Sequence, residues 1–113
     1  MLISKIKTRE EAQDIFNDEV KFAKFVEKNK RFLTSIIGKV RNVSNYDMDD
    51  LYQEARIALY NALREYDPAK RIAEGKKSAS FSTYSYWLIR NEIYHTVYEQ
   101  NKRTSIEKSI EMF

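Results

Sequence analysis

The sequence predicts an all-α fold, a compact bundle of about four helices in a single domain that spans residues 1–113. The 113-residue chain contains only two glycines and one proline, which are the residues that most often mark turns. Apolar residues recur three and four positions apart along most of the chain, the spacing of amphipathic helices. A chain of this length buries one hydrophobic core, so one domain is expected.

The first helix is expected to begin at residues 8–11, Thr-Arg-Glu-Glu, which have the form of a capping box. It is expected to run to about Lys28, with residues 1–21 as an N-terminal extension. A second helix is expected over residues 30–41, and no helix-breaking residue separates the two, so they could also form one continuous helix. The predicted inner residues are Ala12, Ile15, Phe16, Phe22, Ala23 and Val26 in the first helix and Phe32, Leu33, Ile36, Ile37 and Val40 in the second.

The third helix is expected to begin at Asp47 or Asp49, because a carboxylate is favourable at the positive end of a helix. It should end near Tyr66, because the proline at position 68 disfavours helical geometry in the residue before it. A basic, glycine-containing loop is expected over residues 69–79. The predicted inner stripe of this helix is Leu51, Ala55, Ala58, Leu59 and Ala62.

The fourth helix is expected to be capped by Ser80 or Ser82 and to continue to about Asn101. Residues 104–107, Thr-Ser-Ile-Glu, form another capping-box pattern. Residues 104–113 are therefore expected to form a short last helix or a loose tail.

The fourth helix carries two different stripes at a helical spacing of about 100° per residue. Aliphatic residues on one side suffice to anchor it, so the aromatic and polar side is left without a structural role. Aromatic rings beside basic groups suit stacking on unpaired nucleic-acid bases. The alternative is that Trp87 is a core residue, and Leu88 on the same side favours that alternative. The aliphatic stripe is Ile89, Ile93 and Val97; the opposite stripe is Tyr84, Trp87, Asn91, Tyr94, His95 and Tyr98.

Within this stripe, the amide of Asn91 could hydrogen-bond a base edge. The candidate phosphate contacts His95, Lys102 and Arg103 follow along the same helix.

The outward face of the third helix combines apolar and acidic residues. Ile57 and Tyr60 are unusual on a solvated face, and carboxylates surround them. Such a surface suits a basic amphipathic helix from a partner protein. The alternative is that the first helix or a terminus covers both side chains. The face comprises Asp50, Gln53, Glu54, Ile57, Tyr60 and Arg64.

Charge is segregated along the chain, although the formal net charge is only +3. Residues 21–41 contain seven basic residues and one acid, whereas residues 47–54 contain four acids and no base. The two segments suggest two different partners, or simply two solvated helix faces.

The composition argues against several classes of protein. The chain has no cysteine, which excludes disulfides and thiolate metal sites and fits a cytoplasmic protein. It has no apolar run of membrane-spanning length and no secretory signal pattern, so no membrane partner is expected. Asp50 and Glu54 share a helical face without a nearby histidine, and His95 has no evident catalytic companion. We therefore expect a non-enzyme with no cofactor and no metal.

Several segments together resemble region 2 of bacterial sigma factors of the sigma-70 family. Residues 49–60, Asp-Asp-Leu-Tyr-Gln-Glu-Ala-Arg-Ile-Ala-Leu-Tyr, and residues 62–68 look like the docking helix of that family. Residues 81–84, Phe-Ser-Thr-Tyr, and 87–90, Trp-Leu-Ile-Arg, look like its promoter-melting helix. Residues 28–33 are similar to the preceding helix. The resemblance covers roughly residues 22–103 and implies a compact helical domain.

For the docking helix, the resemblance implies binding to a coiled coil in the largest catalytic subunit of core RNA polymerase. Asp50, Gln53 and Glu54 fall on the positions that make this contact. For the melting helix, the resemblance implies opening of the promoter minus-ten element and capture of non-template-strand bases.

Individual residues of the melting helix also match family positions. Tyr84 falls on the aromatic that stacks on a flipped adenine, and Trp87 falls on one of two wedge tryptophans. Asn91 falls where the family reads the upstream edge of the element. Arg90 and His95 would face phosphates.

The chain departs from the family pattern in three places. Leu88 replaces the second wedge tryptophan, and the loop after Pro68 is longer than usual. The chain also stops at Phe113, before the domain that reads the minus-thirty-five element. It is expected to be either a fragment or a natural single-region factor that works with a second protein, with an anti-sigma factor as a further possible partner. The longer loop carries Lys70, Arg71, Lys76 and Lys77. It is expected to lie beside the melting helix, where it could add phosphate contacts or change the base preference.

Two other functions stay open. A polymerase-binding regulator or decoy would keep the docking face without promoter melting. A helical duplex-DNA-binding protein outside the sigma family would read a major groove without polymerase and without preference for unpaired bases.

Overall fold

The described part of the chain contains six α-helices and one 3-10 turn and no strand, so the all-α prediction is confirmed. The structure is a computed structural model that describes the backbone of residues 1–40 and 47–111 and the side chains of residues 1–40 and 47–99. The number of helices exceeds the expected four because the predicted first helix is divided into two and the predicted loop after residue 68 contains a helix. In chain order the elements are η1 (Ile3–Lys5), α1 (Arg9–Phe16), α2 (Glu19–Lys28), α3 (Lys30–Gly38), α4 (Met48–Glu65), α5 (Pro68–Ala73) and α6 (Phe81–Glu111).

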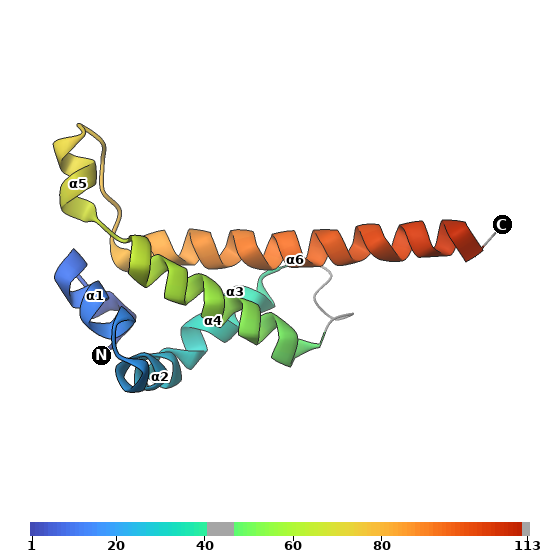
Figure 1. Ribbon diagram of the computed structural model, residues 1–113, viewed down its shortest axis with the longest axis horizontal. Coiled ribbons are helices and arrows are strands. Elements are labelled where there is room, and N and C mark those ends of the chain that lie inside the picture. The colour runs from blue at the N-terminus through green and yellow to red at the C-terminus, as the bar shows by residue number, and fades with distance from the viewer. Residues whose placement is uncertain (41–46, 112–113) are drawn as a thin grey trace.

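The centre of the fold is the packing of α4 against α6 (Figure 1). Three alanines of α4, Ala55, Ala58 and Ala62, are buried, and small side chains allow two helices to approach closely. The predicted aliphatic stripe of α6 is also buried, with Ile89 and Ile93 fully inaccessible. Helix α3 packs on both α4 and α6, while α1 packs on α4. This arrangement leaves one face each of α4 and α6 directed outward.

The predicted first helix is in fact two helices, which corrects the sequence prediction. Thr8 does cap α1, since its Oγ1 accepts a hydrogen bond from the Glu11 amide at 3.2 Å. The chain then turns at Asp18, whose carboxylate accepts hydrogen bonds from the first amides of α2. Aspartate is a preferred N-cap residue because it satisfies amides that have no partner within the helix.

This break changes the register of the following residues. Ala23, which was expected to face the core, is exposed, while Phe25 is buried. The stretch before Asp18 is also not an extension of one helix, because η1 and α1 are separate elements.

Asn29 separates α2 from α3 and resolves the question of a continuous helix. Its side chain is almost fully buried. The amide nitrogen donates to the carbonyl oxygens of Phe25 at 2.7 Å and Met1 at 3.2 Å, and the amide oxygen accepts from the Ile3 amide at 2.8 Å. One buried side chain therefore ends α2 and holds the N-terminal residues against the body of the protein.

Helix α4 agrees with its prediction, because Asp47 caps it and all five predicted inner residues are buried. The segment after it does not. The Asp67 carboxylate accepts from the Lys70 amide at 3.1 Å, with Pro68 at the first helical position, where proline is well tolerated. Asp-Pro thus begins α5 inside the predicted loop, and Gly75, with a positive φ of 74°, turns the chain after it. We call residues 67–79 the insert.

Helix α6 is one continuous element of 31 residues. Ser80 caps it, as one of the two predicted candidates, by accepting from the Thr83 amide at 3.3 Å. The predicted end near Asn101 and the separate last helix are wrong, because no glycine or proline interrupts residues 81–111. The second half of α6 extends beyond the other helices (Figure 1). Within the described residues, none of these helices has the length and apolar character needed to cross a membrane.

Candidate functional site

The outer stripe of α6 lies on the surface of the protein. Trp87 is 52% exposed, although a lone tryptophan is usually a well-buried residue. Asn91 and His95 are also exposed, while Tyr84 and Tyr94 are half-buried. Because the opposite stripe already anchors α6, the interpretation of Trp87 as a core residue does not hold.

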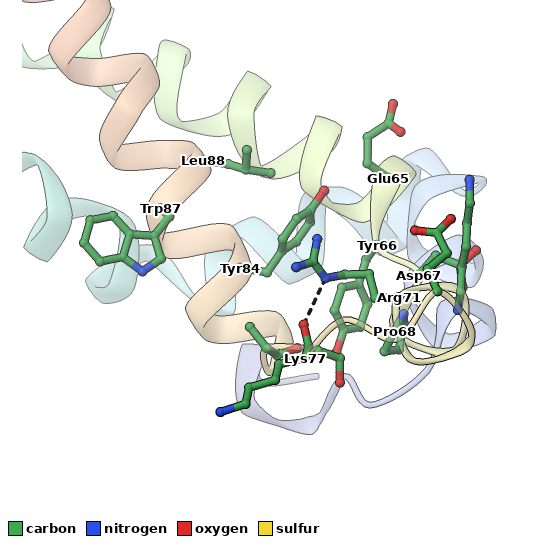
Figure 2. Close-up of a pocket in the computed structure, with 13 residues that line it drawn as sticks. Glu65, Tyr66, Asp67, Pro68, Arg71, Lys77, Tyr84, Trp87 and Leu88 are labelled. Carbon is green, nitrogen blue, oxygen red and sulfur yellow. Dashed lines mark hydrogen bonds between the residues drawn. The ribbon is translucent and has the colours of Figure 1, made fainter.

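A cleft of about 490 Å³ opens beside the first turns of α6 (Figure 2). We call it the α6 cleft. It is bounded by α6 on one side, by the last residues of α4 at its base and by the insert on the other side. Its volume is in the usual range for a small-molecule or single-nucleotide site. Its lining residues are Glu65, Tyr66, Asp67, Pro68, Lys70, Arg71, Glu74, Lys77, Ser78, Ala79, Tyr84, Trp87 and Leu88.

Tyr84 forms the aromatic wall of the α6 cleft. Its ring centroid lies 5.6 Å from that of Tyr66, and Tyr66 in turn contacts the buried ring of Phe81 edge-on at 5.1 Å. Burial, with a smaller contribution from the nearby Glu65 carboxylate, raises the pKa of Tyr84 above its ordinary value. The phenol is therefore neutral at physiological pH and is held in place by the core.

Trp87 is oriented by side chains of its own helix. The Tyr86 ring meets the indole edge-on, with centroids 5.4 Å apart. The guanidinium carbon of Arg90 lies 5.3 Å from the Trp87 ring and 4.5 Å from the Tyr94 ring. A cation over an aromatic face is attractive because the ring carries negative potential there. Arg90, which was predicted to contact a phosphate, thus lies against the rings of Trp87 and Tyr94.

A second, smaller hollow of about 260 Å³ lies on the other side of Trp87. It is lined by Phe32 of α3 and by residues of the first turns of α6, including Tyr86. The ammonium of Lys39 lies 5.7 Å from the Tyr86 ring centroid. Trp87 therefore forms a ridge between the α6 cleft and this second hollow.

The structure also places the remaining candidate residues of α6. Leu88, which stands where the family has a second tryptophan, is half-buried and lines the α6 cleft beside Tyr84. Tyr98 is 64% exposed, one helical turn beyond Tyr94. Lys102 and Arg103 lie outside the residues whose side chains the structure describes.

The predicted outer face of α4 is also on the surface. Asp50, Gln53 and Ile57 are exposed, with Ile57 at 53%, and Glu54 is half-buried. Tyr60 is partly covered, as the alternative interpretation expected. Its ring centroid lies 4.5 Å from that of Phe16 in α1 and 5.2 Å from that of Phe22 in α2, so that 38% of Tyr60 stays accessible.

A shallow hollow of about 240 Å³ lies on this α4 face. Its lining residues are Phe22, Gln53, Arg56, Ile57 and Tyr60. The Nε atom of Arg56 is buried and lacks a hydrogen-bond partner among the residues that the structure describes. The hollow is therefore apolar and is bordered by acidic side chains and by Arg56.

Sequence reasoning missed the residues that other segments bring to these surfaces. Phe16 and Phe22 were assigned to the core, yet they form part of the α4 face. The loop that carries Arg71 and Lys77 was expected to lie beside the melting helix, but the sequence did not indicate that these two residues line a cleft with it. The Asp-Pro pair that begins α5 was the one signal in the sequence that could have indicated an ordered insert.

Metal binding finds no support in the described residues, where no three His, Cys, Asp or Glu side chains gather. The outer face of α6 instead carries aromatic rings, an amide and cations, and the α4 face carries an apolar hollow bordered by acidic side chains. Since α4 and α6 pack directly on each other, their outer faces hold fixed positions relative to one another.

Comparison with known proteins identifies the family. The probable RNA polymerase sigma-C factor of Synechocystis sp. is 32% identical over 80 residues, which is 71% of this chain and 18% of that protein. The sigma factor SigA2 of Synechococcus elongatus is 34% identical over 79 residues, 70% of this chain and 22% of that protein. The sigma-B factor of Nostoc sp. is 30% identical over 90 residues, 80% of this chain and 25% of that protein.

The chain thus spans a quarter or less of the length of these curated relatives. No solved structure matches it significantly. The family model for sigma-70 region 2 matches residues 25–103, which include α4, the insert and most of α6. The chain belongs to the sigma-70 region 2 family, whose members are binding domains and not enzymes.

Proposed function

We propose that this chain binds core RNA polymerase through the outer face of α4 and recognises and melts the promoter minus-ten element through α6. The proposal combines the family membership with the two exposed faces. In it, the polymerase partner is the coiled coil of the largest catalytic subunit, and the DNA partner is the non-template strand. Both partners would be met in the cytoplasm.

The α4 face supports the docking half of this proposal. Asp50, Gln53 and Glu54 carry acceptors on consecutive turns of one helix, beside the apolar hollow that Ile57 and Tyr60 line. A partner helix that combines apolar and basic residues would match this pattern. The acidic border would select a basic partner, and the hollow would bury its apolar side chains.

The exposed indole of Trp87 is the observation that carries the DNA half. A polymerase-binding decoy has no need for an exposed tryptophan held by Tyr86 and Arg90. Flipping a base from the stack costs a few kcal/mol, and a preformed aromatic surface offsets that cost by stacking. In the proposal Trp87 supports the edge of the duplex, Tyr84 stacks on an unpaired base and Asn91 reads the upstream edge.

The docking half is tested by replacing Asp50 and Gln53 together with alanine. We expect the double variant to lose capture of bacterial core RNA polymerase in a pull-down. Glu27→Ala, which removes one exposed carboxylate from α2, serves as the charge control and should bind as the wild type does. Undiminished capture by the double variant would refute docking through α4.

The melting half is tested with Trp87→Ala on core polymerase. We expect polymerase binding to persist, whereas binding to single-stranded minus-ten DNA falls about five- to a hundredfold, since one stacked base is worth about 1–3 kcal/mol. A decoy predicts no difference between wild type and variant, and a duplex reader predicts tight duplex binding without polymerase. Absence of any sequence preference in the polymerase-bound wild type would exclude promoter recognition.

Two further partners belong to the same proposal. A separate protein that reads the minus-thirty-five element would complete promoter recognition. An anti-sigma factor would act by covering the α4 face or the α6 stripe. Co-purification of the tagged chain from its native cells, followed by mass spectrometry, tests both.

A further inference from the structure

The insert is an ordered element that forms one whole wall of the α6 cleft. Helix α5 is capped by Asp67 at its start. After Gly75, the Lys76 amide donates to the Arg71 carbonyl at 2.9 Å. The segment after Gly75, which leads back to α6, is held by the Arg71 side chain, whose Nε donates to the Lys77 carbonyl at 3.2 Å. These contacts hold Arg71 in a defined position opposite α6.

The Arg71 guanidinium reaches toward the Tyr84 ring across the cleft (Figure 2). Its Nε is engaged with the Lys77 carbonyl, so the two terminal nitrogens remain as donors. In the described part of the chain, no carboxylate lies within ion-pair distance of Arg71: Asp67 pairs with Arg9 and Glu74 with Lys76. An arginine whose planar end is unpaired and directed into a cleft is suited to a ligand with two acceptors in one plane.

The ligand chemistry follows from the two walls together. Tyr84 offers a flat, neutral ring for stacking, and the volume of about 490 Å³ accommodates one nucleotide. Guanine presents two acceptors, O6 and N7, on one edge, whereas adenine presents an acceptor beside an amino donor. An arginine therefore discriminates guanine from adenine, because it has no acceptor for the adenine amino group.

We propose that the α6 cleft holds one unpaired guanine of the DNA strand, stacked on Tyr84 and read by Arg71 through O6 and N7. This inference rests on the proposed function, since it names the base taken at the Tyr84 position. It departs from the adenine that the family resemblance implies there. Arg71 is the specificity-determining residue, and the insert supplies it.

The test measures base preference on the complete complex. The full chain is bound to bacterial core RNA polymerase and titrated with fluorescein-labelled thymine strands that carry one central guanine, adenine or cytosine. Core polymerase without the chain gives the background. We expect the guanine strand to bind about tenfold more tightly than the adenine strand, the discrimination typical of one bidentate base contact.

Substitutions at Arg71 separate reading from general affinity. Arg71→Ala should remove the preference for guanine, and Arg71→Gln should shift it to adenine, because glutamine pairs with the N6 and N7 atoms of adenine. Lys76→Ala removes the same charge from the same exposed insert, at a residue that does not line the α6 cleft. It should weaken binding to every strand equally and leave the order of preference unchanged.

The outcomes distinguish this inference from the proposed function. A wild-type preference for adenine, or a guanine preference that survives Arg71→Ala, overturns the reading role of Arg71 and leaves promoter melting intact. If Tyr84→Ala and Trp87→Ala bind every strand as the wild type does, stacking on α6 itself fails and the inference fails with it.

Discussion

Helices α4 and α6 pack on each other and each directs an aromatic residue outward, but the two aromatic residues are supported differently. Tyr60 of α4 is held by Phe16 and Phe22, which come from two other helices. Trp87 of α6 is held by Tyr86 and Arg90, which are its neighbours in the same helix. The α4 face is thus assembled by tertiary structure, whereas the α6 stripe is arranged by local helical spacing.

This difference separates what each surface depends on. A stripe arranged by contacts between residues at most four positions apart forms wherever the helix forms. A face assembled from three helices requires that each helix begins and ends at the correct residue. We therefore expect the α4 face to be sensitive to changes in α1 and α2, and the α6 stripe to be sensitive mainly to changes in α6.

The largest effect should come from the core that both helices share. Ile89→Ala removes a fully buried side chain and should lower the free energy of unfolding by about 3 kcal/mol, because a large-to-small change leaves a cavity. Trp87→Ala, two residues earlier and half exposed, should cost less than about 1 kcal/mol. Urea unfolding followed by circular dichroism measures both. Equal losses would mean that the aromatic stripe also anchors α6.

A smaller effect should appear in the contact between α2 and α4. In a double-mutant cycle, Phe22→Ala and Tyr60→Ala should be coupled by about 1 kcal/mol, the value typical of an aromatic pair. Phe22→Ala alone should also weaken polymerase capture, because it removes the support of Tyr60. Lys24→Ala, on an exposed position of the same helix, is the matched control. Additive effects would show that the α4 face does not depend on α2.

Arg90 should affect the orientation of Trp87 more than the stability of the protein. Arg90→Ala should cost about 0.5–1 kcal/mol, as for a cation–π contact at the surface. It should also increase the fast rotation of the indole in time-resolved fluorescence anisotropy. The measurement reports on one site, because Trp87 is the only tryptophan in the chain. Lys24→Ala controls for the lost charge, and unchanged anisotropy in Arg90→Ala would mean that Tyr86 alone orients the ring.

The smallest effect concerns ionisation in the α6 cleft. Burial raises the pKa of Tyr84 and of Tyr66. Both groups are neutral when protonated, so their contribution to stability is complete below the ordinary tyrosine value of about 10. It is lost as the pH rises through the raised folded-state value. Tyr84→Phe should reduce this alkaline loss of stability. It should also remove, from the phenolate absorbance titration, a component that ionises above the ordinary tyrosine pKa. Loss of a component that titrates at the ordinary tyrosine value would instead place Tyr84 in open solvent.

Much of the fold could be predicted from residue spacing alone. The inner stripes of α4 and α6 and the caps Thr8, Asp47 and Ser80 agree with the structure, because they depend on neighbours within one or two helical turns. The break at Asp18 was missed, since an aspartate within a helical pattern is equally compatible with a solvated helix face. Because of that error, Ala23 was predicted in the core, where the structure has Phe25 instead.

The candidate sites follow the same division. The outer residues of α6 could be named from the sequence, including Trp87, because the aliphatic stripe defines the inner side. The sequence offered coverage of Tyr60 only as one of two alternatives, and it did not place Arg71 in the α6 cleft. Phe16, Phe22 and the insert reach these positions across the tertiary structure. Spacing along one helix carries no information on such contacts.

The hydrogen bond from the Tyr66 hydroxyl to the Ala79 carbonyl, 3.3 Å long, joins the two ends of the insert. Between these ends, every residue from 69 to 79 is exposed, so substitutions there have little effect on folding. The insert can therefore be replaced as a unit, because the Tyr66–Ala79 hydrogen bond holds its two ends together. Replacing the residues between Asp67 and Ala79 offers a way to change this wall of the α6 cleft while the α4–α6 core keeps its stability.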